Sequence, residues 1–346
     1  MNDATHDKTG TVAVFGAYGH TGRFVVKELL DRGLTPVLSG RDEDRLGALA
    51  ADLGGVEARP ASAGDPASLD RALAGAAAVV NCAGPFAVTA APVIEAALRA
   101  GIAYVDVAGE VEAVADTFTH FADRARQAGV PVVPAMAFFG GLADLMATAA
   151  LDGRAADEIL IAYALSSWHP TDGTRASSRV SRERRGGRRL VHTGGRMEYR
   201  TDRAPTGWWS FPEPVGGQAV LGEFTTADSV TIGHHLRPRD IRTCMTTSAV
   251  EDVLGAQTPP PVPVDDRGRS AQTFLVEVVV RAAGFERRAV ARGQDIYAVS
   301  APLAVEAVQR ALSGRIAATG VAAAGAAFDA RDFLHALAPH VSVHIR

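Results

Sequence analysis

The sequence has few of the features that define secreted, metal-binding or membrane proteins. It has two cysteines, Cys82 and Cys244, which excludes a disulfide scaffold or a clustered zinc site and fits a reducing cytosol. Its most apolar stretch, residues 135–151, is interrupted by Asp144 and falls short of the ~18–20 residues that cross a bilayer. The first ten residues are polar and have no signal-peptide core. We therefore expect a soluble, cytoplasmic protein with no membrane partner.

Charge and length narrow the class further. The formal net charge is −4, which gives no general attraction to nucleic acid or to an anionic surface. A hydrophobic fraction of 47% with 21% charged residues is typical of packed globular proteins. A chain of 346 residues indicates two domains, or one domain with a large insertion.

The first 135 residues alternate short β-rich runs with segments of helical periodicity. Asp65 followed by Pro66 is a typical helix start, and Gly33 and Gly75 follow periodic segments as helix stops. Strand and helix alternating at this spacing predict βαβ units and a parallel sheet. The expected strands lie at 11–16, 35–40, 77–84, 102–109 and 130–136.

After residue 137 the runs become longer and alternate apolar with polar residues, including a predicted hairpin across Ala283 and Gly284. We predict an α/β protein: a Rossmann-type parallel sheet with a second α+β substrate domain of mixed or antiparallel sheet. The expected domains are 10–137 for the dinucleotide, 138–300 for substrate and dimerisation, and 301–346, a C-terminal helix packing back on the Rossmann domain. We expect a homo-oligomer.

Three glycines, Gly16, Gly19 and Gly22, follow the first predicted strand and open the first helix. In this context a G-x-x-G-x-x-G loop can turn off the strand, approach a pyrophosphate and let the helix pack closely. The alternative is a tight turn without a ligand. The five strand–helix repeats favour cofactor binding, in which Tyr18, His20 and Thr21 of the same loop would take part.

The end of the second predicted strand indicates which dinucleotide is bound. It reads Leu38-Ser39-Gly40-Arg41, with no carboxylate where the ribose hydroxyls of NAD would be held. Ser39 and Arg41 could instead bind the 2′-phosphate of NADP, although Arg41 could also be a plain surface cation. The sequence therefore favours NADP.

A third strand ends in the turn "NCAGPF", residues 81–86. Parallel sheets bind ligands beyond the carboxyl ends of their strands, so Ala83, Gly84 and Pro85 are predicted to contact the cofactor on its nicotinamide side. Phe86 could form a wall for the ring and the substrate. Cys82, set among apolar residues, is read as an inert thiol.

Together, "GAYGHTGRFVVKELLDRGLTPVLSGRDEDRL", "VVNCAGPF" and "AYVDVAGE" resemble the saccharopine dehydrogenase-like family of NADP-binding reductases. The resemblance covers roughly residues 10–140 and continues weakly at "GQDIYAVSAP". The family includes saccharopine reductases and trans-acting enoyl reductases, so the resemblance implies hydride transfer without fixing the acceptor. Residues 150–290 show no saccharopine-binding pattern.

Candidates for proton transfer come from the second domain. His169 could transfer a proton and stands beside Trp168, a possible substrate wall, and Arg175 could bind an anionic group. A turn with incidental polar residues is the alternative. Tyr297 could donate a proton or be an ordinary half-buried tyrosine. Asp106 and Glu110 could position substrate or cap a helix.

Two further features bear on partners and metals. Residues 179–203 are rich in arginine, which indicates either a solvated hairpin or recognition of a phosphate-bearing partner, such as a carrier-protein-bound or CoA-linked substrate. With little aromatic interleaving, nucleic acid is disfavoured. His234 and His235 would point to opposite faces of a strand, so we expect no metal site.

These observations predict an NADPH-dependent oxidoreductase that reduces a C=C or C=N bond of a small or carrier-borne metabolite by hydride transfer. A ketone acceptor is less favoured because no Y-x-x-x-K pair follows the strands, and the lysines are Lys8 and Lys27 alone. The alternatives are a non-catalytic NADP(H)-binding sensor and an interaction protein with a degenerate cofactor site.

Overall fold

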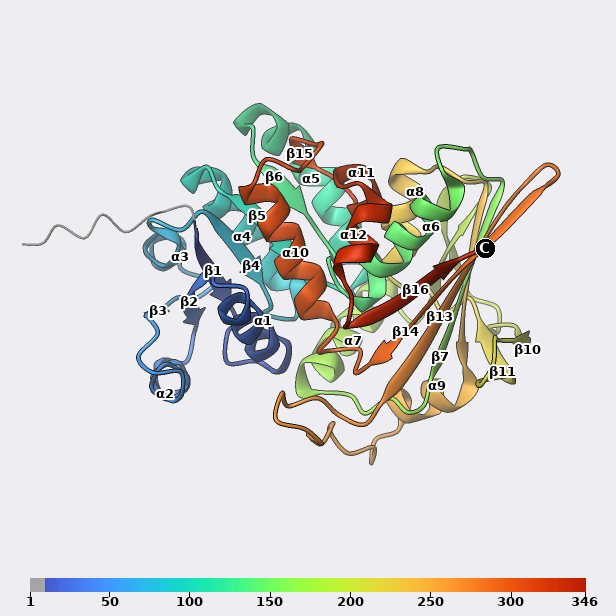
Figure 1. The fold of residues 1–346 in the computed structure, drawn as a ribbon, viewed down its shortest axis with the longest axis horizontal. Helices are drawn as coiled ribbons and strands as arrows, with labels where there is room; N and C mark the ends of the chain where they lie inside the picture. Colours follow the sequence, from blue (N-terminus) through green and yellow to red (C-terminus); the bar gives the residue numbers. More distant parts are fainter. Residues whose placement is uncertain (1–9) are drawn as a thin grey trace, which may run out of the picture.

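Two β-sheets, one parallel and one mixed, organise residues 10–346, the part of the chain that the computed structural model describes (Figure 1). The parallel sheet lies in the order β15-β6-β5-β4-β1-β2-β3, and the predicted α/β fold class is confirmed. Its strands are β1 (Thr11–Phe15), β2 (Thr35–Gly40), β3 (Ala58–Pro60), β4 (Ala78–Asn81), β5 (Ala103–Asp106), β6 (Pro131–Val133) and β15 (Gly320–Val321).

Both faces of this sheet are buried, as its apolar strands require. Along β1, Val12 and Val14 enter one core cluster, whereas Ala13 and Phe15 enter the other. Helices α1, α2 and α10 cover the first face, and α3, α4 and α5 cover the second. These helices are α1 (His20–Asp31), α2 (Glu43–Asp52), α3 (Pro66–Leu73), α4 (Phe86–Ala100), α5 (Val111–Ala128) and α10 (Ser300–Leu312).

The helix boundaries follow the capping residues. The Asp65 carboxylate accepts hydrogen bonds from the Ala67 and Ser68 amides, and Pro66 is the first residue of α3. Asp42 caps α2 in the same way by accepting from the Arg45 amide. The helix start that the sequence predicts at Asp65 is confirmed.

The second sheet is mixed, as predicted. Within residues 10–346 its order is β10-β11-β12-β7-β13-β14-β16, with a β8–β9 hairpin attached to β12; β12 and β7 run parallel. The predicted hairpin at Ala283 and Gly284 joins β13 to β14. The strands are β7 (Glu158–Leu165), β8 (Arg189–Thr193), β9 (Arg196–Arg200), β10 (Thr206–Ser210), β11 (Gly217–Gly222), β12 (Asp240–Thr246), β13 (Thr273–Ala282), β14 (Phe285–Gln294) and β16 (Val341–Ile345).

Helices lie between the two sheets, and the apolar core runs through them without a break. One cluster of buried side chains joins Val12 of β1 to Leu303 of α10 and to Ile161 of β7. α10 contacts α1, and α6 contacts β13 and β14. The remaining helices are the π-helical turn η2 (Phe138–Leu142), α6 (Ala143–Leu151), α7 (Asp172–Arg185), α8 (Asp228–His235), α9 (Thr247–Leu254), α11 (Ala324–Ala327) and α12 (Ala330–Ala336).

Three expectations need correction. His234 and His235 end helix α8 and do not lie in a strand, so the argument from opposite strand faces was wrong. Residues 172–185 form helix α7 and not a turn; its one buried residue is Ser181, so it has no apolar stripe to reveal it. The arginine-rich segment is the end of α7 followed by the β8–β9 hairpin.

Among residues 10–346, no helix combines the length and the apolar character that crossing a bilayer requires.

Candidate cofactor and substrate site

The glycine loop is held tightly between two strand ends. Gly16 has a φ of +87°, and its amide donates to the Ser39 carbonyl at 2.8 Å. A Cβ on Gly16 would lie 2.8 Å from the Ala83 nitrogen, and one on Gly22 would lie 2.9 Å from the Ala17 carbonyl oxygen. Both positions therefore require glycine, because the neighbouring atoms belong to the main chain.

The N-terminus of α1 is open toward this loop. Gly19 is the N-cap residue and offers no side chain to the free amides, and the first turn has no acidic residue. These amides and the positive end of the helix dipole suit a pyrophosphate. Thr21, in the same turn, is half-buried.

The end of β2 lacks a carboxylate directed at a ribose. Ser39 is 1% exposed, and its Oγ has no hydrogen-bond partner among residues 10–346. Asp42, the nearest acid, is occupied as the cap of α2. Arg41 is exposed, and Tyr18 packs on Gly40 while Arg45 stacks on the Tyr18 ring at 4.4 Å. An unpartnered buried hydroxyl next to an exposed arginine fits the 2′-phosphate of NADP.

A buried hydrogen-bond chain supports the turn after β4 from below. Asn81 accepts from the Ala83 amide at 3.0 Å and donates to the Tyr104 hydroxyl at 3.2 Å. Tyr104 in turn donates to the Asp106 carboxylate at 2.8 Å. Burial raises the pKa of Asp106 to about 6. The other oxygen of Asp106 accepts hydrogen bonds from the main-chain amides of Ala108 and Ala135. Asp106 therefore supports the turn from within the core.

Glu110 caps helix α4 from outside it. Its two carboxylate oxygens accept from the Phe86 amide at 2.7 Å and from the Ala87 amide at 3.0 Å. Of the two interpretations of Glu110, the structure supports the helix cap. Phe86 itself is 7% exposed and packs in the core on the α4 side of the sheet.

Helix α7 covers this turn. A Cβ on Gly84 would lie 3.0 Å from Ser177 Oγ, so the helix approaches the "NCAGPF" backbone closely. The far end of α7 is fixed to α5 by ion pairs of Arg184 with Asp116 and of Arg185 with Glu112, both at 2.7 Å. The sequence did not place α7 at the site.

Tyr297 is the centre of a hydrogen-bond cluster in the second domain. Its hydroxyl lies 3.2 Å from Trp168 Nε1, 2.9 Å from Thr174 Oγ1 and 3.4 Å from the Thr171 amide. It donates to the His169 carbonyl oxygen at 3.3 Å. Tyr297 thus meets His169 through the main chain and not through the imidazole. Burial raises the pKa of Tyr297, so the phenol is protonated at neutral pH.

The glycine loop and this cluster touch. The rings of His20 and Tyr297 meet edge to face with their centroids 5.1 Å apart. Nε2 of His20 is buried and has no hydrogen-bond partner in the described part of the chain. Burial lowers the pKa of this imidazole, and the charge of Asp295 opposes that shift. The fold therefore joins two residues that are 277 positions apart and that the sequence assigned to different roles.

Aromatic rings pack against one another beside Tyr297. The Phe139 and Trp168 ring centroids are 5.3 Å apart, those of Phe139 and Tyr163 are 5.1 Å apart, and those of Trp168 and Phe224 are 6.0 Å apart. Sequence reasoning missed Phe139 and Phe224. The adjacent Phe138-Phe139 pair before two glycines, at a break in the strand rhythm, was the available signal.

The Arg175 side chain is engaged by main-chain carbonyl groups, and the Cys82 thiol is held in its protonated form. The Arg175 guanidinium donates to the carbonyl oxygens of Gly255, at 3.3 Å, and Thr258, at 2.7 Å, which anchors α7 to the loop after α9. Its role toward substrate stays a prediction. Burial raises the pKa of Cys82, which keeps the thiol protonated and fits its interpretation as inert. Within residues 10–346 no three His, Cys, Asp or Glu side chains are grouped as around a metal ion.

A parallel sheet with a glycine loop before α1 and a ligand-facing turn after β4 defines a Rossmann-type dinucleotide-binding domain. Residues 12–133 match the family described as the saccharopine dehydrogenase NADP binding domain. The family resemblance noted in the sequence is therefore confirmed over residues 12–133, and the description of that family supports NADP as the cofactor.

Two curated proteins are similar to this chain over part of its length. The chain is 28% identical over 160 residues to a saccharopine dehydrogenase-like oxidoreductase of Bos taurus, covering 41% of this chain and 37% of that protein. It is 31% identical over 142 residues to a probable mitochondrial saccharopine dehydrogenase-like oxidoreductase of Arabidopsis thaliana, covering 37% and 31%. The matches thus span about a third of the length of these relatives. Their similarity to this chain therefore concerns a segment of at most 160 residues.

The fold extends the likeness beyond the first domain. Apo saccharopine dehydrogenase (L-Glu forming) from Saccharomyces cerevisiae superposes with a TM-score of 0.66 over 97% of this chain and 100% of that chain. The sequence identity is 14%, so this comparison concerns the fold and not the substrate.

Proposed function

We propose that this saccharopine dehydrogenase-like chain is an NADPH-dependent reductase of a C=C or C=N bond in a small or carrier-borne metabolite. The observation that carries the proposal is the edge-to-face contact of Tyr297 with His20. It sets a protonated phenol from the second domain against the loop that receives the dinucleotide. A sensor would need the loop but no such phenol.

The residues present fit NADP. The amides of the Gly16–Gly22 loop would hold the pyrophosphate, and Ser39 with Arg41 would hold the 2′-phosphate. Ala83, Gly84 and Pro85 would flank the nicotinamide. Bound NADPH supplies the hydride.

The chain itself must then orient the acceptor and provide a proton. Hydrogen bonds from Trp168 Nε1 and the Thr171 amide to the Tyr297 oxygen would stabilise negative charge that develops there when its proton moves. Phe139 and Trp168 form an apolar wall that limits water. We favour Tyr297 over His169 as proton donor, because the hydrogen bond between them engages the His169 carbonyl and not its imidazole.

The arginine-rich segment supports a phosphate-bearing substrate. Residues 179–203 contain nine arginines against three carboxylates. On α7, Arg179 and Arg182 are exposed and make no ion pair with any residue in the described part of the chain. Both lie on the helix that covers the cofactor turn, and an exposed guanidinium suits a phosphate.

The test follows NADPH oxidation with a panel of enoyl thioesters, cyclic imines and ketones. We expect turnover with members of the first two classes and a ~100-fold lower kcat for Tyr297→Phe, the usual range for loss of a general acid. Tyr199→Phe is the matched control, because Tyr199 is 47% exposed on β9. Tight NADPH binding without turnover of any substrate would favour the sensor. A Tyr297→Phe enzyme with unchanged kcat and pH profile would assign the proton to another group.

A further inference from the structure

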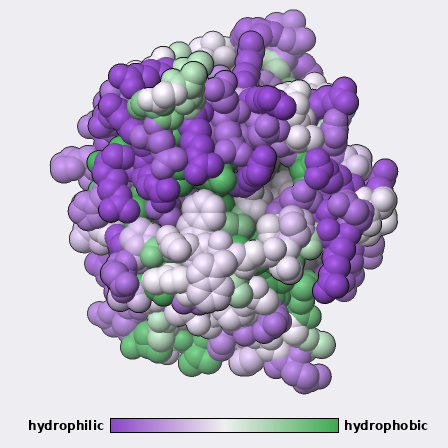
Figure 2. Space-filling view, turned by 90° about the vertical axis from the view of Figure 1, so that its right-hand side faces the viewer, coloured by the Kyte–Doolittle hydropathy of each residue, from purple (hydrophilic) through white to green (hydrophobic). Residues whose placement is uncertain are grey.

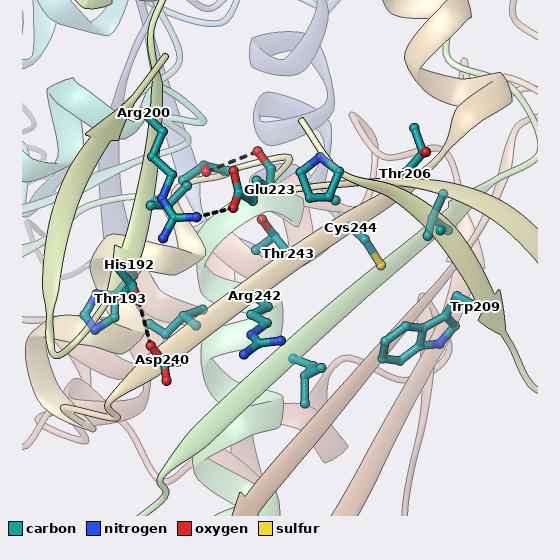
Figure 3. Close-up of a pocket in the computed structure, with 18 of the residues that line it drawn as sticks. His192, Thr193, Arg200, Thr206, Trp209, Glu223, Asp240, Arg242, Thr243 and Cys244 are labelled. Carbon is teal, nitrogen blue, oxygen red and sulfur yellow. Dashed lines mark hydrogen bonds and ion pairs between the residues drawn. The ribbon is translucent and has the colours of Figure 1, made fainter. Parts of the chain in front are cut away.

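The second sheet has a fork at β12. β8 pairs with β12 at Ile241, whereas β11 pairs with it from Cys244 onward. Between these pairings, at Arg242 and Thr243, the two neighbouring strands diverge and leave a cavity of about 490 Å³ (Figure 3). No residue assigned above to the cofactor or to the proton donor lines this cavity. Its volume lies within the ~300–1,000 Å³ of small-molecule sites.

The walls of this cavity are largely apolar. Leu160, Val191 and Val220 contribute aliphatic side chains, and Trp209 contributes an indole. The indole plane is fixed, because Trp209 Nε1 donates to the buried Glu277 carboxylate at 2.8 Å. Figure 2 looks onto this end of the molecule, where pale residues of intermediate hydropathy cross the middle below a strongly hydrophilic region. A rigid aromatic wall of this kind suits a planar ring.

Most charges around the cavity are compensated within the protein. Arg200 pairs with Glu223 at 2.9 Å, and the Thr193 hydroxyl donates to Asp240 at 2.9 Å. Asp240 also lies close enough to Arg239 and Arg242 for both to lower its pKa. These groups add little net charge of their own.

Arg242 differs from the other charged residues. Its side chain is 69% exposed, and Nε contacts Glu158 at 3.0 Å, a carboxylate that Arg281 shares at 3.1 Å. The two terminal guanidinium nitrogens have no partner among residues 10–346. In Figure 3 this side chain projects into the middle of the cavity, between Asp240 and Trp209. A guanidinium with its fork open is suited to bind a carboxylate through two parallel hydrogen bonds.

We propose that the β12 fork is a second ligand site, distinct from the dinucleotide site, that takes a small planar aromatic carboxylate. The ring lies along the apolar wall beside Trp209, and the carboxylate binds the open fork of Arg242. The apolar wall beside Trp209 selects the ring, and the Arg242 guanidinium selects the acid.

The experiment uses the full chain saturated with NADPH and calorimetric titration with 2-naphthoate. The uncharged 2-naphthalenemethanol, of nearly the same shape, is the matched ligand. We expect 2-naphthoate to bind at least tenfold more tightly than the alcohol, and Arg242→Gln to remove that difference. Arg239→Gln is the matched variant, because Arg239 is 79% exposed beside Asp240 but does not line the cavity. It should bind 2-naphthoate as the wild type does.

The NADPH affinity of each variant, measured in the same preparation, shows whether the protein is folded. A variant that keeps NADPH and loses 2-naphthoate supports the site. Equal binding of acid and alcohol, or equal behaviour of Arg242→Gln and Arg239→Gln, would overturn it. Trp208 also lines the cavity and is 69% exposed. Failure of 2-naphthoate to bind, together with self-association that Trp208→Asp abolishes, would identify the fork as a contact between copies and also overturn the proposal. None of these outcomes depends on the reductase reaction.

Discussion

Replacing Gly22 with alanine tests whether the glycine loop is a phosphate cradle. The added Cβ would lie 2.9 Å from the Ala17 carbonyl oxygen and well inside contact distance of the Gly16 oxygen. Favourable contacts lie near ~3.5 Å, so the loop and α1 must separate by roughly 1 Å. The loop cannot follow freely, because the Gly16 amide is bonded to Ser39 at 2.8 Å and the Gly19 amide to Gly16 at 3.0 Å.

Overpacking of this kind costs about 1–3 kcal/mol of folding free energy. The affinity for NADPH should fall by more than the loss of folding free energy alone would suggest, because the displaced amides are the groups that would bind the pyrophosphate. We expect at least a tenfold higher Kd, or ~1.4 kcal/mol. Gly47→Ala is the control: Gly47 lies in α2 with nothing within 4 Å of its Cβ position, so alanine should stabilise the protein by ~0.5–1 kcal/mol. Calorimetric titration and urea unfolding measure both quantities. A Gly22→Ala protein with wild-type NADPH affinity would refute the cradle.

Three further predictions concern the choice of cofactor, the cap of α4, and Asp228, a buried carboxylate at the start of α8. Arg41→Ala should remove an at least tenfold preference for NADPH over NADH, measured by titration with both; an unchanged preference would leave Ser39 and the loop as the selecting groups. Glu110→Gln should lower the free energy of unfolding by ~1 kcal/mol, because the α4 amides lose a charged acceptor. Urea titration measures this loss, with Glu251→Gln, an exposed carboxylate on α9, as the control. Burial raises the pKa of Asp228 from 3.8 to about 6, so its folded form holds a proton that the unfolded chain has lost between those values. The contribution of Asp228 to the free energy of unfolding therefore falls as pH rises. The free energy of unfolding of wild type minus that of Asp228→Asn should be about 2 kcal/mol larger at pH ~4.5 than at pH ~7.5. Parallel pH profiles of the two proteins would contradict this.

The parallel sheet was largely predictable, because each of its long strands carries its own apolar run. Asp42 and Asp65 mark the starts of two intervening helices, and Gly101 and Gly129 mark the ends of two others. β3 escaped because Ala58–Pro60 is three residues long and contains an arginine and a proline. β15 escaped because two residues from near the C-terminus complete a sheet that begins near residue 11. Neither carries a local pattern that could reveal it.

The site was predictable in its parts but not in its assembly. The loop, Ser39 and the "NCAGPF" turn are local motifs, and each lies where the strand ends place it. The meeting of His20 with Tyr297 depends on how α10 returns to α1, which no periodicity encodes. α7 was missed because polar residues cover a helix that rests on Ser181 and on ion pairs, although Thr171, which accepts from the Thr174 amide, was a readable cap. The oligomeric state, the cytoplasmic location and the roles of His169 and Arg175 stay predictions.

The late return of α10 has a consequence for synthesis on the ribosome. The face of the parallel sheet that α10 covers is formed by strands complete at residue 133, whereas α10 begins at residue 300. During translation of the intervening segment, that apolar face has no α10 to cover it, which is a state prone to aggregation. The nascent chain thus needs either transient cover from the growing second sheet or a chaperone. Slow translation through residues 134–300 would lengthen that exposure, and the first domain alone would be less soluble than the whole chain.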